Sequence, residues 1–366
     1  MHKAMRLVTI LSIAALAITA CAAEDNDESE EGLASEAGAD ASEDEPASEG
    51  DVRDDVDLTI AGAGAGAPAA VMSGLLADYL RTHAEVPGVA GTSQTTGGLV
   101  ENTRLLEAGE VDFGLVGGTQ LWVATNSTGP FEGEDPYENL RPLFPIYETG
   151  FLWLTFDDDI DELADFAGKR VNIGPPGSAF AQLSEITLTA AGVWDDVDVE
   201  NQDWAEGVRL MQDGLVDAIP AIGPNPMPAV QEAAAVPGHD LKVLPIDDAT
   251  MDTIRRDFPE LNEIPMEANL HADGVPAEDT VSVGYYGYLV ANKDLDDDVV
   301  YDVMSAYLSE DGQTFLVDNF AGFALGFEQL PGFEHLEPLG VPLHPGAIQY
   351  WEDQGETVPD SLKPTG

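Results

Sequence analysis

The sequence predicts an α/β protein whose folded part consists of two similar halves with a cleft between them. Apolar segments of strand length alternate with helical segments, and short glycine-rich turns separate them, an order typical of the α/β class. The pattern at residues 104–112 recurs at 209–217, and each copy combines a helix end, a glycine and a Val-Asp strand start. The length of 366 residues and the hydrophobic content of 44% leave room for two or three domains. A cleft between two such halves is a common place for a ligand.

Residues 1–21 are typical of an export signal. Lys3 and Arg6 precede a short apolar run, and small residues resembling a lipobox lead to Cys21, the one cysteine of the chain. The run is shorter than the ~20 residues that a membrane-spanning helix needs. We interpret residues 1–21 as a lipoprotein signal peptide with lipidation at Cys21, which would anchor the exported protein to the outer face of the cytoplasmic membrane. The alternative is a cleaved signal beside an incidental cysteine.

Residues 22–57 consist almost entirely of acidic and small residues. Such a segment cannot bury enough apolar surface to offset its ordering entropy, so we expect a disordered acidic linker and a folded part that begins near Leu58. Over the whole chain, 14 Lys and Arg stand against 69 Asp and Glu, a net charge of -55. This charge disfavours nucleic-acid partners. It indicates either a halophilic source or an acidic trap for cations.

The first half begins with an expected strand at 58–60 that enters a glycine-rich turn at 62–67. Pro68 is suited to the first position of a helix, where its missing N–H costs nothing. A second helix is expected from Leu99 to Ala108, and a strand at 111–116 follows it. The apolar face of the first helix is expected to consist of Val71, Leu75, Leu76, Tyr79 and Leu80.

The second half repeats this order. A strand is expected at 170–173, followed by a turn with two glycines at 174–177. Ser178 is a favourable N-cap residue for a helix that ends at Gly192. The copy of the repeat at 209–217 then supplies the next helix end and strand start, as in the first half.

Four turns combine glycines with small or hydroxyl residues at strand-to-helix junctions: 62–67, 95–98, 117–120 and 174–178. The first also matches the G-x-G-x-x-A form of a dinucleotide-binding fingerprint, but we do not expect an exported lipoprotein to use that cofactor. Glycines let backbone N–H groups approach a ligand, and a helix N-terminus favours an anion. Each turn alone is equally consistent with a tight turn and a helix cap, whereas four together favour a shared pocket for a small polar molecule.

No catalytic or metal-binding constellation is evident. The six histidines show no H-x-x-x-H pair, there is no G-x-S-x-G elbow, and the Asp runs lack the spacing of a calcium loop. His344, within a Pro-Leu-His-Pro-Gly segment, is interpreted as a structural turn residue rather than a base. We therefore expect no enzyme activity, no cofactor and no metal.

With these features in view, the chain resembles the TAXI family, the extracytoplasmic solute receptors of TRAP-type secondary transporters. The resemblance covers residues 58 to 353 and rests on the order and spacing of several segments. These segments are 62–74, 96–98 with 100–102, 104–112, 168–171, 174–178, 217–218, 226–231, 299–301 and 342–350.

The resemblance implies a bilobal type II periplasmic-binding-protein fold with a ligand cleft between two α/β lobes. Lobe one would comprise 58–148 plus 284–366, and lobe two 149–283. The protein would be a monomer that captures a small polar solute and delivers it to TRAP membrane permease subunits. Two alternatives stay open: an exported enzyme on a similar bilobal frame, and the receptor of an ATP-driven importer.

Three departures from the family concern the ligand. Ala69 and Ala70 stand where a pair of tyrosines is usual, Leu99 replaces a polar residue, and residues 117–119 read Gly-Gly-Thr rather than Gln-Ser-Asp. The resemblance implies carboxylate or amino-acid-like solutes, yet these cleft elements contain no Lys or Arg. An anion would then depend on backbone N–H groups and on hydroxyl groups.

We expect the hydroxyls of Thr96 and Ser178 to donate hydrogen bonds to the solute, and Tyr147 and Phe180 to bound its pocket. The complete set of expected ligand-binding residues is Gly64, Gly66, Thr96, Gly97, Gly98, Gly118, Thr119, Tyr147, Pro175, Gly177, Ser178, Phe180 and Asn225.

Overall fold

The structure, a computed structural model, describes residues 56–65, 67–84, 86 and 88–365. The predicted signal peptide, Cys21, nearly all of the predicted linker and Gly66 lie outside the described residues. Within the described part, no helix is both long enough and apolar enough to cross a membrane.

Strands and helices alternate along most of the described chain. The strands are β1 (Val56–Ala61), β2 (Val89–Gln94), β3 (Phe113–Gly117), β4 (Leu140–Thr155), β5 (Arg170–Asn172), β6 (Asp198–Glu200), β7 (Ala218–Gly223), β8 (Lys242–Leu244), β9 (Asn262–Met266) and β10 (Thr280–Asn292). The α-helices are α1 (Pro68–Thr82), α2 (Leu99–Ala108), α3 (Gly118–Thr125), α4 (Ala179–Ala190), α5 (Trp204–Gln212), α6 (Pro228–Ala234), α7 (Asp248–Asp257), α8 (Asp297–Tyr307), α9 (Glu310–Asn319), α10 (Gly322–Phe327), α11 (Phe333–Leu336) and α12 (Pro345–Asp353).

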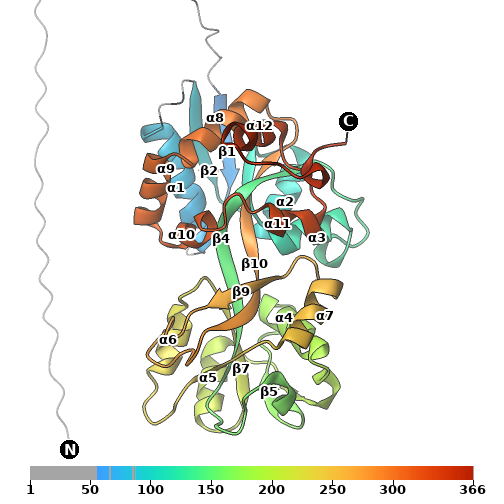
Figure 1. Cartoon of the computed structure of the whole chain (residues 1–366), viewed down its shortest axis with the longest axis vertical. Helices are drawn as coiled ribbons and strands as arrows, with labels where there is room; N and C mark the ends of the chain where they lie inside the picture. Colours follow the sequence, from blue (N-terminus) through green and yellow to red (C-terminus); the bar gives the residue numbers. More distant parts are fainter. Residues whose placement is uncertain (1–55, 66, 85, 87, 366) are drawn as a thin grey trace, which may run out of the picture. The chain divides into compact units, whose positions relative to one another are not determined.

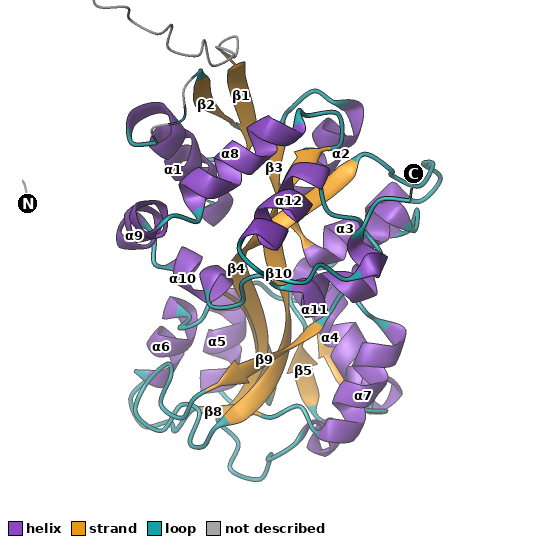
Figure 2. Cartoon of the chain, turned by 45° about the horizontal axis from the view of Figure 1, so that its top comes forward, coloured by secondary structure: helices purple, strands orange, loops and turns teal. Residues whose placement is uncertain are grey.

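The sheet has the order β2-β1-β3-β10-β4-β7-β5-β6, with β8 paired to β4 and β9 to β10. Each end of this order is a parallel βαβαβ unit in which the first strand lies between the second and the third. The long strands β4 and β10 are antiparallel partners at the middle and run from one half to the other (Figure 1). Helices flank the sheet on both sides (Figure 2). The predicted α/β class and the two similar halves are confirmed.

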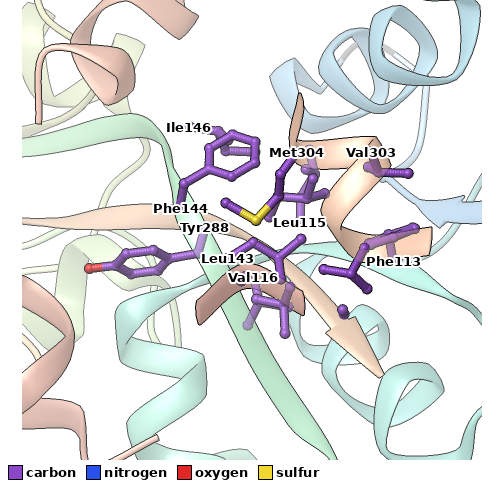
Figure 3. Close-up of a cluster of buried hydrophobic side chains, with 14 of the residues drawn as sticks. Phe113, Leu115, Val116, Leu143, Phe144, Ile146, Tyr288, Val303 and Met304 are labelled. Atoms are coloured by element: carbon purple, nitrogen blue, oxygen red, sulfur yellow. The ribbon is translucent and has the colours of Figure 1, made fainter. Parts of the chain in front are cut away.

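Three clusters of buried apolar side chains form the core. The largest is built mainly from β1, β3, the first part of β4, the second part of β10 and helices α1, α8 and α12. Figure 3 shows its centre, where side chains of β3, β4, β10 and α8 meet around Met304. The other two clusters surround the second part of β4, one on the side of α4 and α7 and the other on the side of α5 and α6. The predicted lobe boundaries themselves remain a prediction.

Several local predictions are confirmed. The α2 helix begins and ends at the expected residues, Gly109 closes it with a left-handed φ of 68°, and Ser178 caps α4 by accepting a hydrogen bond from the Ala181 amide. One expectation is wrong, because Val71 has 46% of its surface exposed. Met72, one position further, is buried instead. The inward face of α1 is therefore rotated relative to the predicted stripe.

The sequence repeat has the same structural role in both halves. The carboxylate of Asp112 accepts a hydrogen bond from the Thr59 amide at 2.7 Å, and that of Asp217 accepts one from the Arg170 amide at 2.8 Å. Each Asp thus joins the start of the third strand of its unit to the first strand. The repeat therefore marks equivalent positions in the two βαβαβ units.

Candidate functional site

The first wall of the site is the turn between β1 and α1. Gly62 is required there, because a Cβ atom would collide with the Ser73 hydroxyl of α1. Pro68 opens α1, and its N-cap residue Ala67 makes no side-chain hydrogen bond to the helix. Pro68 has no N–H, and the Ala70 amide donates to the Ala67 carbonyl at 3.0 Å. The Ala69 amide is therefore the donor of this first turn that no side-chain cap occupies.

The turn between β2 and α2 forms the second wall. Its anchor is the Asn102 side chain, whose amide nitrogen donates to the carbonyls of Gly62 at 2.7 Å and Leu115 at 2.9 Å. The Thr96 hydroxyl lies 2.6 Å from the Asn102 amide oxygen and 3.0 Å from the Gly62 carbonyl. These bonds tie together the ends of β1, β2 and β3. The N-cap of α2 is Gly98, so this helix also begins without a side-chain cap.

The crossing strands supply the third wall. Thr149 of β4 lies opposite Tyr285 of β10, and Tyr147 lies opposite Gly287. A Cβ atom at residue 287 would overlap the Tyr147 ring, so the glycine lets this ring lie flat against β10. Burial raises the pKa of both tyrosines. Both phenols therefore stay neutral and can act as hydrogen-bond donors.

Together these walls and the segment after β7 enclose a cavity of about 550 Å³, which we call the cleft cavity. Its surface is built from small residues, backbone and aromatic rings, and its lining residues include no Lys, Arg or His. They are Ala63, Gly64, Ala65, Ala67, Pro68, Ala69, Met72, Gly97, Gly98, Leu99, Tyr147, Glu148, Thr149, Ile222, Gly223, Pro224, Tyr285, Phe320 and Gly322.

Glu148 is the one carboxyl group in this lining. Only 5% of its surface is exposed. Burial raises its pKa to about 7, while a hydrogen bond from Asn225 acts in the opposite direction and the charge of Glu328 raises it further. The Asn225 amide nitrogen donates to Glu148 Oε1 at 3.3 Å. The carboxyl group therefore changes its charge near neutral pH.

The structure brings four of the predicted ligand residues to the cleft cavity: Gly64, Gly97, Gly98 and Tyr147. Thr96 is buried beside the cavity, where its hydroxyl serves the Asn102 network. Asn225 lines a neighbouring cavity together with Glu148. Gly66 lies outside the described residues.

The remaining predicted residues do not line the cleft cavity. Gly118 and Thr119 begin α3, where the Thr119 hydroxyl donates to the Gln120 side chain. Ser178 caps α4, and its hydroxyl donates to the Pro175 carbonyl at 2.6 Å. Pro175 and Gly177 are exposed, and Phe180 is half-buried. Their role in binding remains a prediction.

Sequence reasoning missed Glu148, Thr149 and Tyr285. No local signal distinguishes them, because Glu148 is one acid among many and Tyr285 lies far along the chain from its partner strand. Strand β4 is 16 residues long and pairs antiparallel with β10, and this pairing brings the three residues together.

The chemistry of the cleft cavity suits binding. Its lining contains no Ser, Cys, His or Lys that could act as a nucleophile, and Glu148 is its one carboxyl group. Over the described part of the chain, no three His, Cys, Asp or Glu residues are grouped as a metal site requires. Two uncapped helix N-termini, aromatic rings and one carboxyl group are instead suited to hold a small molecule.

Comparison with solved structures places this architecture in a class. A TctC solute-binding protein from Polaromonas is 14% identical, with 78% of this chain and 96% of that chain covered and a TM-score of 0.50. The periplasmic sulfonate-binding protein SsuA from Methylobacillus flagellatus KT is 12% identical, with 83% and 88% covered and a TM-score of 0.48. The likeness to the Polaromonas structure indicates a shared fold. The chain has the bilobal fold of the periplasmic solute-binding proteins, as predicted.

The family follows from the sequence match. Residues 60–355 match the NMT1-like family, so the chain belongs to this family.

Proposed function

We propose that this protein is the extracytoplasmic solute receptor of a TRAP-type secondary transporter, as its resemblance to the TAXI family implies. It would capture a small polar solute, possess no catalytic activity, and deliver the solute to membrane permease subunits driven by an ion gradient. A lipid on Cys21 would tether it to the outer face of the cytoplasmic membrane. The bilobal fold, membership of the NMT1-like family and the composition of the cleft cavity support this proposal.

The cleft cavity carries the proposal. It lies where the βαβαβ unit of β1–β3, the crossing strands and the segment after β7 meet, so a bound solute would contact both halves. A solute that contacts both halves favours the arrangement in which those contacts form together. We propose that the turn at 174–178 contributes Ser178, Pro175 and Gly177 in that arrangement, as the sequence predicts.

The test begins with mass spectrometry of small molecules released when the full-length protein, purified from its source, is denatured. The identified solute is then added back while thermal unfolding is followed. At 100 times its dissociation constant it should stabilise the protein by about 2.7 kcal/mol. Conversion of the solute into a product would show an enzyme instead of a receptor.

Two matched variants locate the solute. Ala65→Trp places an indole in the cleft cavity from an exposed turn, and it should abolish the stabilisation. Pro175→Trp adds the same group to the corresponding turn of the second half. It should reduce the affinity for the solute only if that turn contacts the solute. Full stabilisation of Ala65→Trp would contradict binding in the cleft cavity.

The transporter class needs a separate assay. Uptake by vesicles that contain the cognate permease should depend on the receptor and on an imposed ion gradient, and it should proceed without ATP. Uptake that requires ATP would assign the receptor to an ATP-driven importer.

A further inference from the structure

A second cavity, of about 810 Å³, lies beside the cleft cavity and shares Glu148 with it; we call it the acidic chamber. Four of its lining residues are carboxylic acids, and no Lys, Arg or His is among them. Its lining residues are Glu148, Asn225, Pro226, Pro265, Met266, Glu267, Leu270, Asp279, Thr280, Val281, Leu325, Glu328 and Gln329.

Among the four acids of the chamber, Glu267, Asp279 and Glu328 are exposed, and only Glu148 differs from the acids of the surrounding surface. A strongly acidic surface consists of hydrated carboxylates, and most Asp and Glu residues of the described chain are at least partly exposed. Glu148 and Glu260 are the two acids of the described chain that are buried. Burial of a carboxyl group is unfavourable unless a partner compensates it. Glu148 therefore needs an explanation other than solubility.

The second observation is a buried hydrogen-bond acceptor, Asn225 Oδ1, that receives no hydrogen bond. Asn225 is 8% exposed, and its amide oxygen Oδ1 is buried with no hydrogen-bond partner. Its amide nitrogen is directed to Glu148 Oε1 at 3.3 Å. Gly150 allows this position, since a Cβ there would lie 3.1 Å from that amide nitrogen. Asn225 and Glu148 both line the acidic chamber, and its lining residues supply no cation to this acceptor pair.

We propose that the acidic chamber is a binding site for a small protonated amine, whose ammonium group donates hydrogen bonds to the Glu148 carboxylate and to Asn225 Oδ1. An ammonium group carries three donors and a full positive charge, which matches an acceptor-only pair. Glu267, Asp279 and Glu328 line the same chamber and would attract a second positive charge, so a diamine fits better than a monoamine. This site goes beyond the proposed receptor function and does not depend on the identity of the cleft solute.

The groups around Glu148 give the binding a pH dependence. Tyr286 is its cross-strand neighbour on β10, Asn225 faces it from the segment after β7, and Glu328 acts on it from the end of α10. With a pKa of about 7, Glu148 is mostly protonated at pH 6 and mostly ionised at pH 8. An ammonium group binds the ionised form, so the apparent affinity should be roughly ten-fold higher at pH 8 than at pH 6.

The experiment is calorimetric titration of the full-length protein with putrescine, with 1,4-butanediol as the uncharged control. Measurement in about 1 M NaCl, where the screening length is ~3 Å, suppresses general attraction by the acidic surface. Glu148→Gln should weaken putrescine binding about ten- to a hundred-fold and remove its pH dependence. Glu260→Gln, which neutralises the other buried acid outside the chamber, should leave binding unchanged.

Two further variants sharpen the result. Glu328→Gln, a substitution at an exposed residue, should weaken putrescine binding a few-fold. Ala65→Trp, which fills the cleft cavity, should leave it intact. Equal weakening by Glu148→Gln and Glu260→Gln, loss of binding in Ala65→Trp, or binding of the diol would overturn the proposal. The receptor function would stand or fall separately, by whether Ala65→Trp abolishes stabilisation by the released solute.

Discussion

The two βαβαβ units have the same topology, but their helices begin differently. In both units, a glycine with a left-handed backbone (Gly109 or Gly214) follows the helix between the second and third strands, and an Asp side chain joins the third strand to the first. In the first unit, helices α1 and α2 begin without side-chain caps, and their N-termini line the cleft cavity. In the second, Ser178 caps α4 and Asp203 caps α5. The comparison shows that α4 and α5 of the second unit have side-chain N-caps, whereas α1 and α2 have none. At α2 the Gly97 and Gly98 amides donate instead to the Glu101 and Thr96 side chains.

The junctions at the strand ends differ in the same way. Asn102 of α2 bridges the ends of β1 and β3 behind the cleft turns. In the second unit, Asn172 at the end of β5 accepts from the amides of Gly174 and Gln202. Each Asn holds a turn in place, but the turns held by Asn102 are those that line the cleft cavity.

The largest effect is expected from removal of these two side chains. Asn102→Ala should lower the free energy of unfolding by roughly 3 kcal/mol, because it removes the buried hydrogen bonds from Asn102 to the Gly62 and Leu115 carbonyls and its contact with the Thr96 hydroxyl. It should also weaken solute binding. Asn172→Ala should lower the free energy of unfolding by roughly 1.5 kcal/mol and leave solute affinity unchanged. Urea unfolding and calorimetry measure both quantities, and equal effects on affinity would contradict the assignment of the ligand turns to the first unit.

The buried acids offer a second comparison. The folded-state pKa of Glu148 is raised from 4.5 to about 7, so its contribution to stability is present below pH 4.5 and is lost as the pH rises through 7. Glu148→Gln does not have this loss. Relative to wild type, its free energy of unfolding should therefore increase by about 3 kcal/mol between pH 4.5 and pH 8. Burial also raises the pKa of Glu260. The free energy of unfolding of Glu260→Gln, relative to wild type, should therefore also increase as the pH rises.

The measurement is urea unfolding of the three proteins across this pH range. Saturating putrescine should reduce the gain of Glu148→Gln at pH 8, because the amine stabilises the ionised carboxylate of wild type, and it should not affect the gain of Glu260→Gln. A constant difference between Glu148→Gln and wild type at all pH values would refute the assigned titration of Glu148.

The smallest effect tests the caps themselves. Ser178→Ala should destabilise the protein by about 1 kcal/mol through loss of the N-cap of α4. Ala67→Asp adds a cap to α1, whose N-cap residue already has an extended backbone, and it should stabilise by about 0.5–1 kcal/mol. The added carboxylate would occupy N–H groups at the cleft cavity, so solute affinity should fall. Undiminished affinity in Ala67→Asp would show that the solute does not use these donors.

The amino-acid sequence by itself determined the local elements, because their signals act over a few residues. Pro68, Gly109 and Ser178 define helix ends through backbone geometry and hydrogen bonds to near neighbours. The repeat at 104–112 and 209–217 revealed the two units, since equivalent packing requires equivalent side chains. The expected residues Gly64, Gly97 and Gly98 line the cleft cavity because strand-to-helix turns of a parallel unit meet at one edge of the sheet, whereas Tyr147 reaches it from the crossing strand β4.

Only the tertiary structure decided which polar groups lose their water. Pairing of β4 with β10 places Tyr285 opposite Thr149 and Tyr286 opposite Glu148, although more than a hundred residues separate the strands in the chain. Among 69 acids, no local pattern distinguishes the one at the centre of this crossing. Thr96 shows the converse, since its turn was recognised but its hydroxyl is bound to Asn102. Desolvation and long-range pairing depend on the packed chain, whereas caps and turns depend on a few adjacent residues.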